Sequence, residues 1–116
     1  MSNFIQAVKT DELADGTMRE VLVQGYEILL VRAGDKYYAA DNRCPHMRGN
    51  LSQGKFEGTI VTCLRHGSQF DLRDGQVVRW LKGSDLISKL FKAFQPPRPL
   101  TIYNVKVEDD RVLIEI

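Results

Sequence analysis

Every cysteine and every histidine of this chain lies in one of two short segments. The first is Cys44-Pro45-His46, and the second, Cys63-Leu64-Arg65-His66, follows after sixteen residues. A thiolate and an imidazole, each offered twice, make a set of four soft-to-borderline metal ligands. Calcium and magnesium prefer oxygen ligands, so the set points to zinc or iron.

The spacing of the ligands bears on whether they hold one metal atom or two. A single zinc ion usually takes a ligand pair separated by two to four residues. Cys63 and His66 fit that spacing, whereas Cys44 and His46 are separated only by Pro45, whose ring fixes φ. We expect the side chains of this first pair to diverge, which suits two metal atoms better than one. A two-iron cluster is therefore favoured, and a zinc site is the alternative.

The two segments resemble the cluster-binding motif of Rieske [2Fe–2S] proteins in residue type, order and both spacings. Residues 67–71, Gly-Ser-Gln-Phe-Asp, are also similar to the stretch that follows the second ligand pair in that family. The resemblance implies that Cys44 and Cys63 bind the inner iron of one [2Fe–2S] cluster, and that His46 and His66 bind the outer iron. With no further cysteines, the chain is most similar to the soluble ferredoxin branch.

Eight further residues are expected to surround the cluster, as close backbone, apolar cover, or hydrogen-bond donors. They are Pro45, Met47, Gly49, Leu64, Gly67, Ser68, Phe70 and Pro99. Turn formation, core packing and a rigid linker are the competing explanations for the same residues. In high-potential relatives a serine and a tyrosine donate hydroxyl hydrogen bonds to the sulfurs. Ser68 matches the serine, but Phe70 replaces the tyrosine, so we expect a potential in the lower part of the Rieske range or somewhat above it.

Length and charge limit what else the chain does. Its 116 residues suffice for one domain, residues 1–116, within which residues 41–72 are expected to form a cluster-binding subdomain. The 16 basic and 15 acidic residues nearly balance, so no overall field favours nucleic acid. Arg43, Arg48 and Arg65 lie close to the ligands and suggest an acidic partner surface, with solvated loop arginines as the alternative.

The hydropathy pattern predicts a chain that does not span a membrane. No window of 18 apolar residues occurs, and residues 1–6 lack both a basic and an apolar signal region. We therefore expect a soluble, cytoplasmic protein.

Short apolar segments separated by turn residues predict a mostly antiparallel, all-β fold, a Rieske-like sandwich or barrel. Gly34-Asp35, Asp74-Gly75 and Glu108-Asp109-Asp110 are typical of hairpin turns. The expected strands are residues 4–8, 18–23, 26–31, 36–40, 59–62, 69–72, 76–80, 100–107 and 111–116.

One segment favours a short helix instead. Residues 84–95 place apolar side chains at spacings of three and four, after Ser84 as a cap and before two prolines that end the helix. Packing on the sheet and docking of a partner are both open for this face.

The motif and its resemblance predict an electron-transfer protein rather than an enzyme. A Rieske ferredoxin passes single electrons between a reductase and a terminal oxidoreductase, such as a ring-hydroxylating oxygenase. A small subunit or regulatory module of a larger oxidoreductase, resembling that of nitrite reductase, is the second hypothesis. A zinc-stabilised binding module is the third.

Overall fold

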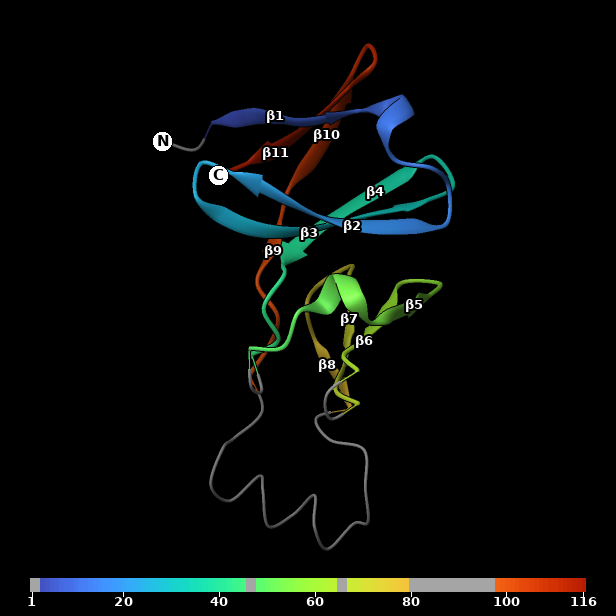
Figure 1. Ribbon diagram of the computed structural model, residues 1–116, viewed down its shortest axis with the longest axis vertical. Helices are drawn as coiled ribbons and strands as arrows, with labels where there is room; N and C mark the ends of the chain where they lie inside the picture. Colours follow the sequence, from blue (N-terminus) through green and yellow to red (C-terminus); the bar gives the residue numbers. More distant parts are fainter. Residues whose placement is uncertain (1–2, 46–47, 65–66, 80–97) are drawn as a thin grey trace, which may run out of the picture.

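Three antiparallel sheets form the part of the chain that the computed structural model describes, residues 3–45, 48–64, 67–79 and 98–116 (Figure 1). The strands are β1 Phe4–Lys9, β2 Thr17–Val23, β3 Tyr26–Ala33, β4 Lys36–Asp41, β5 Lys55–Glu57, β6 Ile60–Thr62, β7 Gln69–Asp71, β8 Val77–Arg79, β9 Ile102–Tyr103, β10 Val105–Glu108 and β11 Arg111–Glu115. Two single-turn 3₁₀ helices, η1 Thr10–Glu12 and η2 Leu51–Gln53, interrupt them.

The three sheets form layers along the long axis of the molecule. Their strand orders are β1-β11-β10, β2-β3-β4-β9 and β5-β6-β7-β8. In Figure 1 the first two sheets form the upper body, and the β5–β8 sheet lies below them. The turn between β10 and β11 is at the top of this view, while the loops that follow β4 and β6 lie at the lower end of the described part of the chain.

Strand β3 is buried on both faces, and this positions the lower sheet. Its central residues, Ile28 to Val31, have no exposed surface. Because side chains alternate along a strand, Ile28 and Leu30 join the core shared with β1 and β11, whereas Leu29 and Val31 join the core shared with the lower sheet. A continuous apolar run of this kind is typical of a strand covered on both sides.

The predicted all-β, antiparallel fold is confirmed, including the three hairpins at Gly34-Asp35, Asp74-Gly75 and residues 108–110. Two details were wrong. Residues 100–107 are not one strand, because β9 pairs with β4 whereas β10 pairs with β11 in another sheet. Residues 55–57 form β5, a strand that was not among those expected. The helix predicted over residues 84–95 lies outside the described residues.

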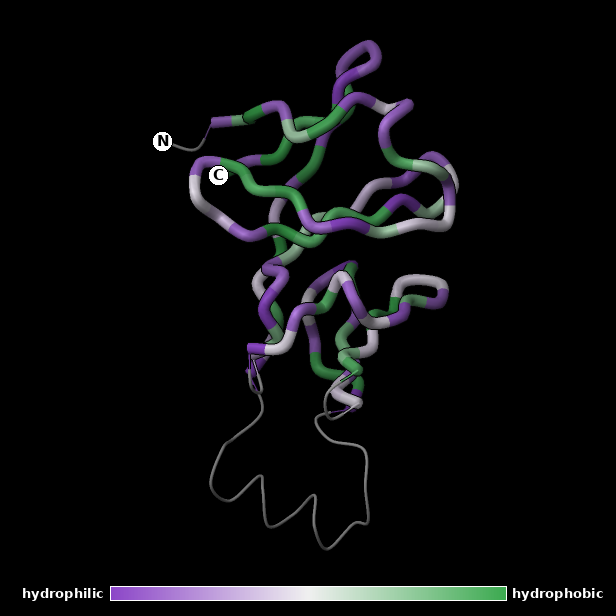
Figure 2. The backbone as a smooth tube through the Cα atoms, in the orientation of Figure 1, coloured by the Kyte–Doolittle hydropathy of each residue, from purple (hydrophilic) through white to green (hydrophobic). Residues whose placement is uncertain are grey.

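Hydropathy follows the layers. Figure 2 shows hydrophobic residues along β3 and within the lower sheet, and hydrophilic residues at the β10–β11 turn.

Among the described residues, no helix has both the length and the apolar character needed to cross a membrane.

Candidate metal centre

The two cysteine loops close by the same pair of backbone hydrogen bonds. In the first loop, the Cys44 N–H donates to the Gly49 carbonyl at 2.8 Å, and the Arg48 N–H donates to the Cys44 carbonyl at 2.6 Å. In the second loop, the Cys63 N–H donates to the Ser68 carbonyl at 2.8 Å, and the Gly67 N–H donates to the Cys63 carbonyl at 3.0 Å. Each loop is therefore a six-residue unit that begins at its cysteine.

The fifth residue of both loops adopts a left-handed backbone conformation. Gly67 has a φ of 75° and Arg48 has a φ of 56°. This conformation is easy for glycine and costs other residues about 1 kcal/mol or more. Gly67 was expected to bring close backbone to the cluster, which stays a prediction, and its left-handed φ supplies a conformational reason for glycine here. The same backbone position in the first loop is occupied by Arg48.

Both cysteines lie in the core between the middle and lower sheets. Cys44 is 1% exposed and Cys63 is 3% exposed, and they belong to one buried cluster with Leu29, Phe70 and Leu100. Cys44 follows β4 and Cys63 follows β6, so the fold brings together two residues that are nineteen positions apart. Two buried thiol groups in one cluster fit the inner half of a mixed cysteine–histidine site.

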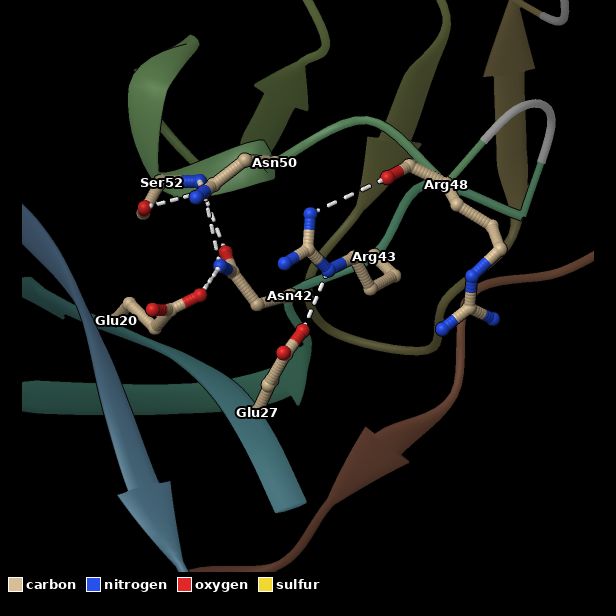
Figure 3. A network of polar contacts seen from close by, with 7 residues as sticks. All are labelled: Glu20, Glu27, Asn42, Arg43, Arg48, Asn50 and Ser52. Atoms are coloured by element: carbon tan, nitrogen blue, oxygen red, sulfur yellow. Dashed lines mark hydrogen bonds and ion pairs between the residues drawn. The ribbon is translucent and has the colours of Figure 1, made fainter. Parts of the chain in front are cut away.

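A buried asparagine fastens the first loop to the middle sheet (Figure 3). Asn42 has no exposed surface, and its side-chain amide donates to the Glu20 carboxylate and, at 2.9 Å, to the Asn50 side-chain carbonyl. Its own side-chain carbonyl accepts from the Ser52 N–H at 2.9 Å. All the polar atoms of this side chain are paired, as burial requires.

A partly exposed ion pair fastens the same loop from its other side. The Arg43 guanidinium donates to the Glu27 carboxylate at 2.5 Å, and this hydrogen bond lowers the pKa of Glu27. A second nitrogen of Arg43 reaches the Arg48 carbonyl at 3.5 Å. Glu27 lies on β3, so this ion pair attaches the first loop to the strand that is buried on both faces.

Hydrogen bonds join residues 98–101 to the first loop, to the end of β4 and to the turn between β7 and β8. The Arg98 guanidinium donates to the Pro45 carbonyl at 3.0 Å, and the Asp41 N–H donates to the Thr101 carbonyl at 2.9 Å. The Leu100 N–H donates to the Gly75 carbonyl at 2.8 Å, and a Cβ on Gly75 would lie only 2.0 Å from the Leu100 carbonyl oxygen. Glycine at this position therefore permits a close approach of two backbones.

The second loop is the connection of the β6–β7 hairpin and has its own supports. Thr62 pairs with Gln69 at the base of the hairpin, and the Arg79 guanidinium of β8 donates to the Gly67 carbonyl at 2.9 Å. After β7, Arg73 donates to the Asp71 carboxylate at 2.7 Å. This hydrogen bond from Arg73 is the main reason that the pKa of Asp71 falls from 3.8 to about 2, and hydrogen bonds from the Arg73 backbone and the Thr59 side chain contribute, while burial opposes them.

The other residues expected near the cluster have different surroundings. Gly49, Ser68 and Phe70 are buried, and Phe70 is the largest side chain without exposed surface among the described residues. Pro45 is partly exposed and Pro99 is exposed, and they line a common pocket with Cys44. Leu64 is 61% exposed. His46, Met47 and His66 lie outside the described residues, as does Arg65.

Comparison with known proteins assigns the family. The model of the Rieske [2Fe–2S] domain matches residues 3–88. The ferredoxin component of the naphthalene 1,2-dioxygenase/salicylate 5-hydroxylase systems of a Ralstonia species is 31% identical over 114 residues, which cover 98% of this chain and 96% of the relative. The chain therefore belongs to the Rieske [2Fe–2S] domain family.

Solved structures agree with this assignment. The ferredoxin of carbazole 1,9a-dioxygenase from Nocardioides aromaticivorans IC177 superposes with a TM-score of 0.79 at 25% identity, covering 97% of this chain and 96% of that one. A chain in the complex of reduced oxygenase and oxidised ferredoxin of carbazole 1,9a-dioxygenase gives 0.75 at 24% identity, covering 96% and 91%. At that identity the second likeness shows the fold alone.

Sequence reasoning missed the residues that support the first loop from a distance. Glu20 contacts Asn42 from 22 positions away, and neither residue belongs to a recognisable motif. Arg98 could have been found, because it directly precedes Pro99, which was expected to lie near the cluster.

We predict that Asn42→Asp destabilises the protein by about 2 to 3 kcal/mol at neutral pH, because a carboxylate would replace the amide that donates to Glu20 and Asn50. Asn104→Asp is the matched control, since Asn104 donates to Glu115 on the surface at 2.8 Å, and it should cost less than about 0.5 kcal/mol. Urea unfolding measures both. Equal losses would show that the buried network does not anchor the loop.

We also predict a contribution of Asp71 to acid stability. Because folding lowers its pKa, the contribution is present above about pH 4 and is lost as pH falls towards 2. Because solvent screens the exposed Arg73, the contribution of Asp71 to the free energy of unfolding is limited to about 1 to 2 kcal/mol. Asp71→Asn should therefore lower the unfolding free energy at pH 6 and remove part of its decline between pH 5 and 2. Asp74→Asn, an exposed neighbour, is the control, and equal pH profiles for the two variants would refute the assignment.

Proposed function

We propose that this chain is a one-electron carrier that holds one Rieske-type [2Fe–2S] cluster. The observation that carries the proposal is the burial of Cys44 and Cys63 in one side-chain cluster, on loops with the same backbone hydrogen bonds. Cys44 and Cys63 would bind one iron, and His46 and His66 the other. The residues around them, 41–72, would form the cluster-binding subdomain of a single domain spanning residues 1–116.

The relatives support a place for this carrier in an oxygenase system. The similar Ralstonia protein is named as a ferredoxin component, and it matches this chain over nearly the full length of both. We infer that this chain likewise receives an electron from a reductase and passes it to a terminal oxygenase. A cytoplasmic location stays a prediction, which fractionation of producing cells would test.

The protein contributes position, charge and exclusion of water. The two loops hold the cysteines in the core, where apolar side chains such as Leu29 and Phe70 keep water away from them. Two thiolates bring less negative charge than four, so adding an electron costs less work than in an all-cysteine site. When bound, the cluster accepts and releases one electron. Because backbone hydrogen bonds close both loops at their cysteines, we expect the two cysteines to move little when the charge changes.

Anaerobic loading of the chain with ferrous iron and sulfide tests the proposal. We expect the loaded protein to be reddish brown and to take up one electron per chain in a coulometric titration. Cys63→Ser should abolish the stable loading. A chain that binds zinc alone, or takes up no electron, would refute the proposal.

We predict that Phe70→Tyr raises the reduction potential. Phe70 is buried in the cluster that contains both cysteines, so the added hydroxyl would be placed among them to donate to sulfur. A hydrogen bond worth about 0.5 to 1.5 kcal/mol in the reduced state corresponds to about 20 to 65 mV for one electron. Direct electrochemistry measures the shift.

Phe56→Tyr is the control for this experiment. Phe56 packs against the same core from β5 but is only partly buried. Its variant should leave the potential within a few millivolts. If Phe70→Tyr shifts the potential no more than Phe56→Tyr does, a hydroxyl at position 70 does not donate a hydrogen bond to the sulfurs.

A further inference from the structure

A pocket of about 410 Å³ opens beside the first cysteine loop and is lined by three arginines. Arg43 and Arg48 come from the loop itself, and Arg98 comes from residues 98–101. Cys44 forms part of the same wall, and Asp41 is its one acidic residue. Three positive side chains therefore meet one carboxyl group directly beside a cysteine that is proposed to bind iron.

Much of the hydrogen-bonding capacity of these arginines is available to a ligand. A guanidinium group has five N–H donors. Arg43 uses part of its capacity on Glu27, and Arg98 uses one nitrogen on the Pro45 carbonyl. Within the described residues, the ion pairs shorter than 4.0 Å include neither Arg48 nor Arg98. In Figure 3 the one contact drawn to Arg48 ends on its carbonyl oxygen, and its guanidinium group extends away from that of Arg43.

The backbone at Arg48 gives an independent argument. The loop requires a left-handed residue here, and the second loop uses Gly67 at the same position. Arginine makes the loop less stable than glycine would, by about 1 kcal/mol. Strained residues cluster at functional sites, although the left-handed Gln24 and Asp109 show that turns use them too. The exposed side chain of Arg48 lines the pocket, so the function is expected there.

We propose that this pocket binds a carboxylate side chain of the redox partner protein and so docks an acidic partner surface against the first cysteine loop. Guanidinium groups bind carboxylates through paired, charge-assisted hydrogen bonds, and charge complementarity guides such encounters. The inference rests on the proposed function and adds the chemistry of the partner and the residues that recognise it. Arg98 is new to this surface, since sequence proximity indicated only Arg43, Arg48 and Arg65.

Electron transfer from the loaded, reduced protein to small oxidants of opposite charge tests the inference. Hexacyanoferrate(III) is the anionic probe, and hexaammineruthenium(III) is the cationic one. At low salt, Arg48→Gln and Arg98→Gln should each lower the rate constant with hexacyanoferrate(III) about three- to tenfold, and added salt should reduce the difference. Neither variant should slow the reaction with hexaammineruthenium(III), which controls for a changed potential.

Arg111→Gln is the matched control, because it removes one positive charge from an exposed residue at the start of β11. The turn that connects β10 to β11 lies at the opposite end of the described chain from the cysteine loops (Figure 1). It should change the rate with either oxidant less than twofold. A loss with hexacyanoferrate(III) as large as that of Arg48→Gln would mean that only net charge matters, and would overturn the inference.

A tetraglutamate peptide tests recognition of carboxylates themselves. It should slow oxidation of the native protein by hexacyanoferrate(III) more than tetraglutamine does at the same ionic strength, and this effect should be lost in Arg48→Gln. Equal effects of the two peptides on the native protein would overturn the inference. If the native protein does not load or exchange an electron with either oxidant, the proposed function itself fails. Normal exchange with no difference among the variants rejects only the docking pocket.

Discussion

The structure depends on holding two cysteine loops, nineteen positions apart at their cysteines, in one buried cluster. Each loop closes through a cysteine N–H and a cysteine carbonyl, so the residue that would bind metal also fixes the backbone of its loop. In each loop, the thiolate that would bind iron and the backbone groups that close the loop therefore belong to the same residue. The rest of the fold can be understood as keeping both loops, and with them both cysteines, in this buried cluster.

Strand β3 is the support that both loops share. One of its faces completes the upper core, while the other meets the cysteines through Leu29 and Val31. The polar attachments of the first loop also end on this sheet, at Glu20 and Glu27. Apolar packing sets the distance between the sheets, and the hydrogen bonds set the register of the loop, because they are directional. The upper sheets, which contribute no proposed ligand, therefore still contribute to the geometry of the site.

The sequence was most informative where structure is local. Gly34-Asp35 and Asp74-Gly75 predicted their hairpins correctly because the conformation of a short turn depends largely on its own residues, which number two between β3 and β4 and five between β7 and β8. The run at residues 100–107 has the apolar pattern of one strand, and only its pairing with β4 and then with β11 divides it near Asn104. Pairings of this kind depend on residues distant in sequence.

The same distinction applies to the site. Ligand types and spacing predicted Cys44 and Cys63 as metal ligands, which stays a prediction, and the structure places both in one buried cluster. The contact of Asn42 with Glu20, and that of Arg98 with Pro45 across 53 positions, exist only once the sheets are assembled. Residues that bind a cofactor have distinctive chemistry, whereas residues that position them are ordinary polar side chains. A motif therefore predicts the former and not the latter.

Electron paramagnetic resonance of the dithionite-reduced protein, with iron and sulfide quantified in the same sample, tests the central claim most directly. Two cysteines and two histidines around a diiron core predict two irons and two sulfides per chain. They also predict a rhombic signal whose average g-value is lower than that of an all-thiolate cluster. A signal with the average g-value of an all-thiolate cluster, or a colourless protein without a signal, would contradict the account.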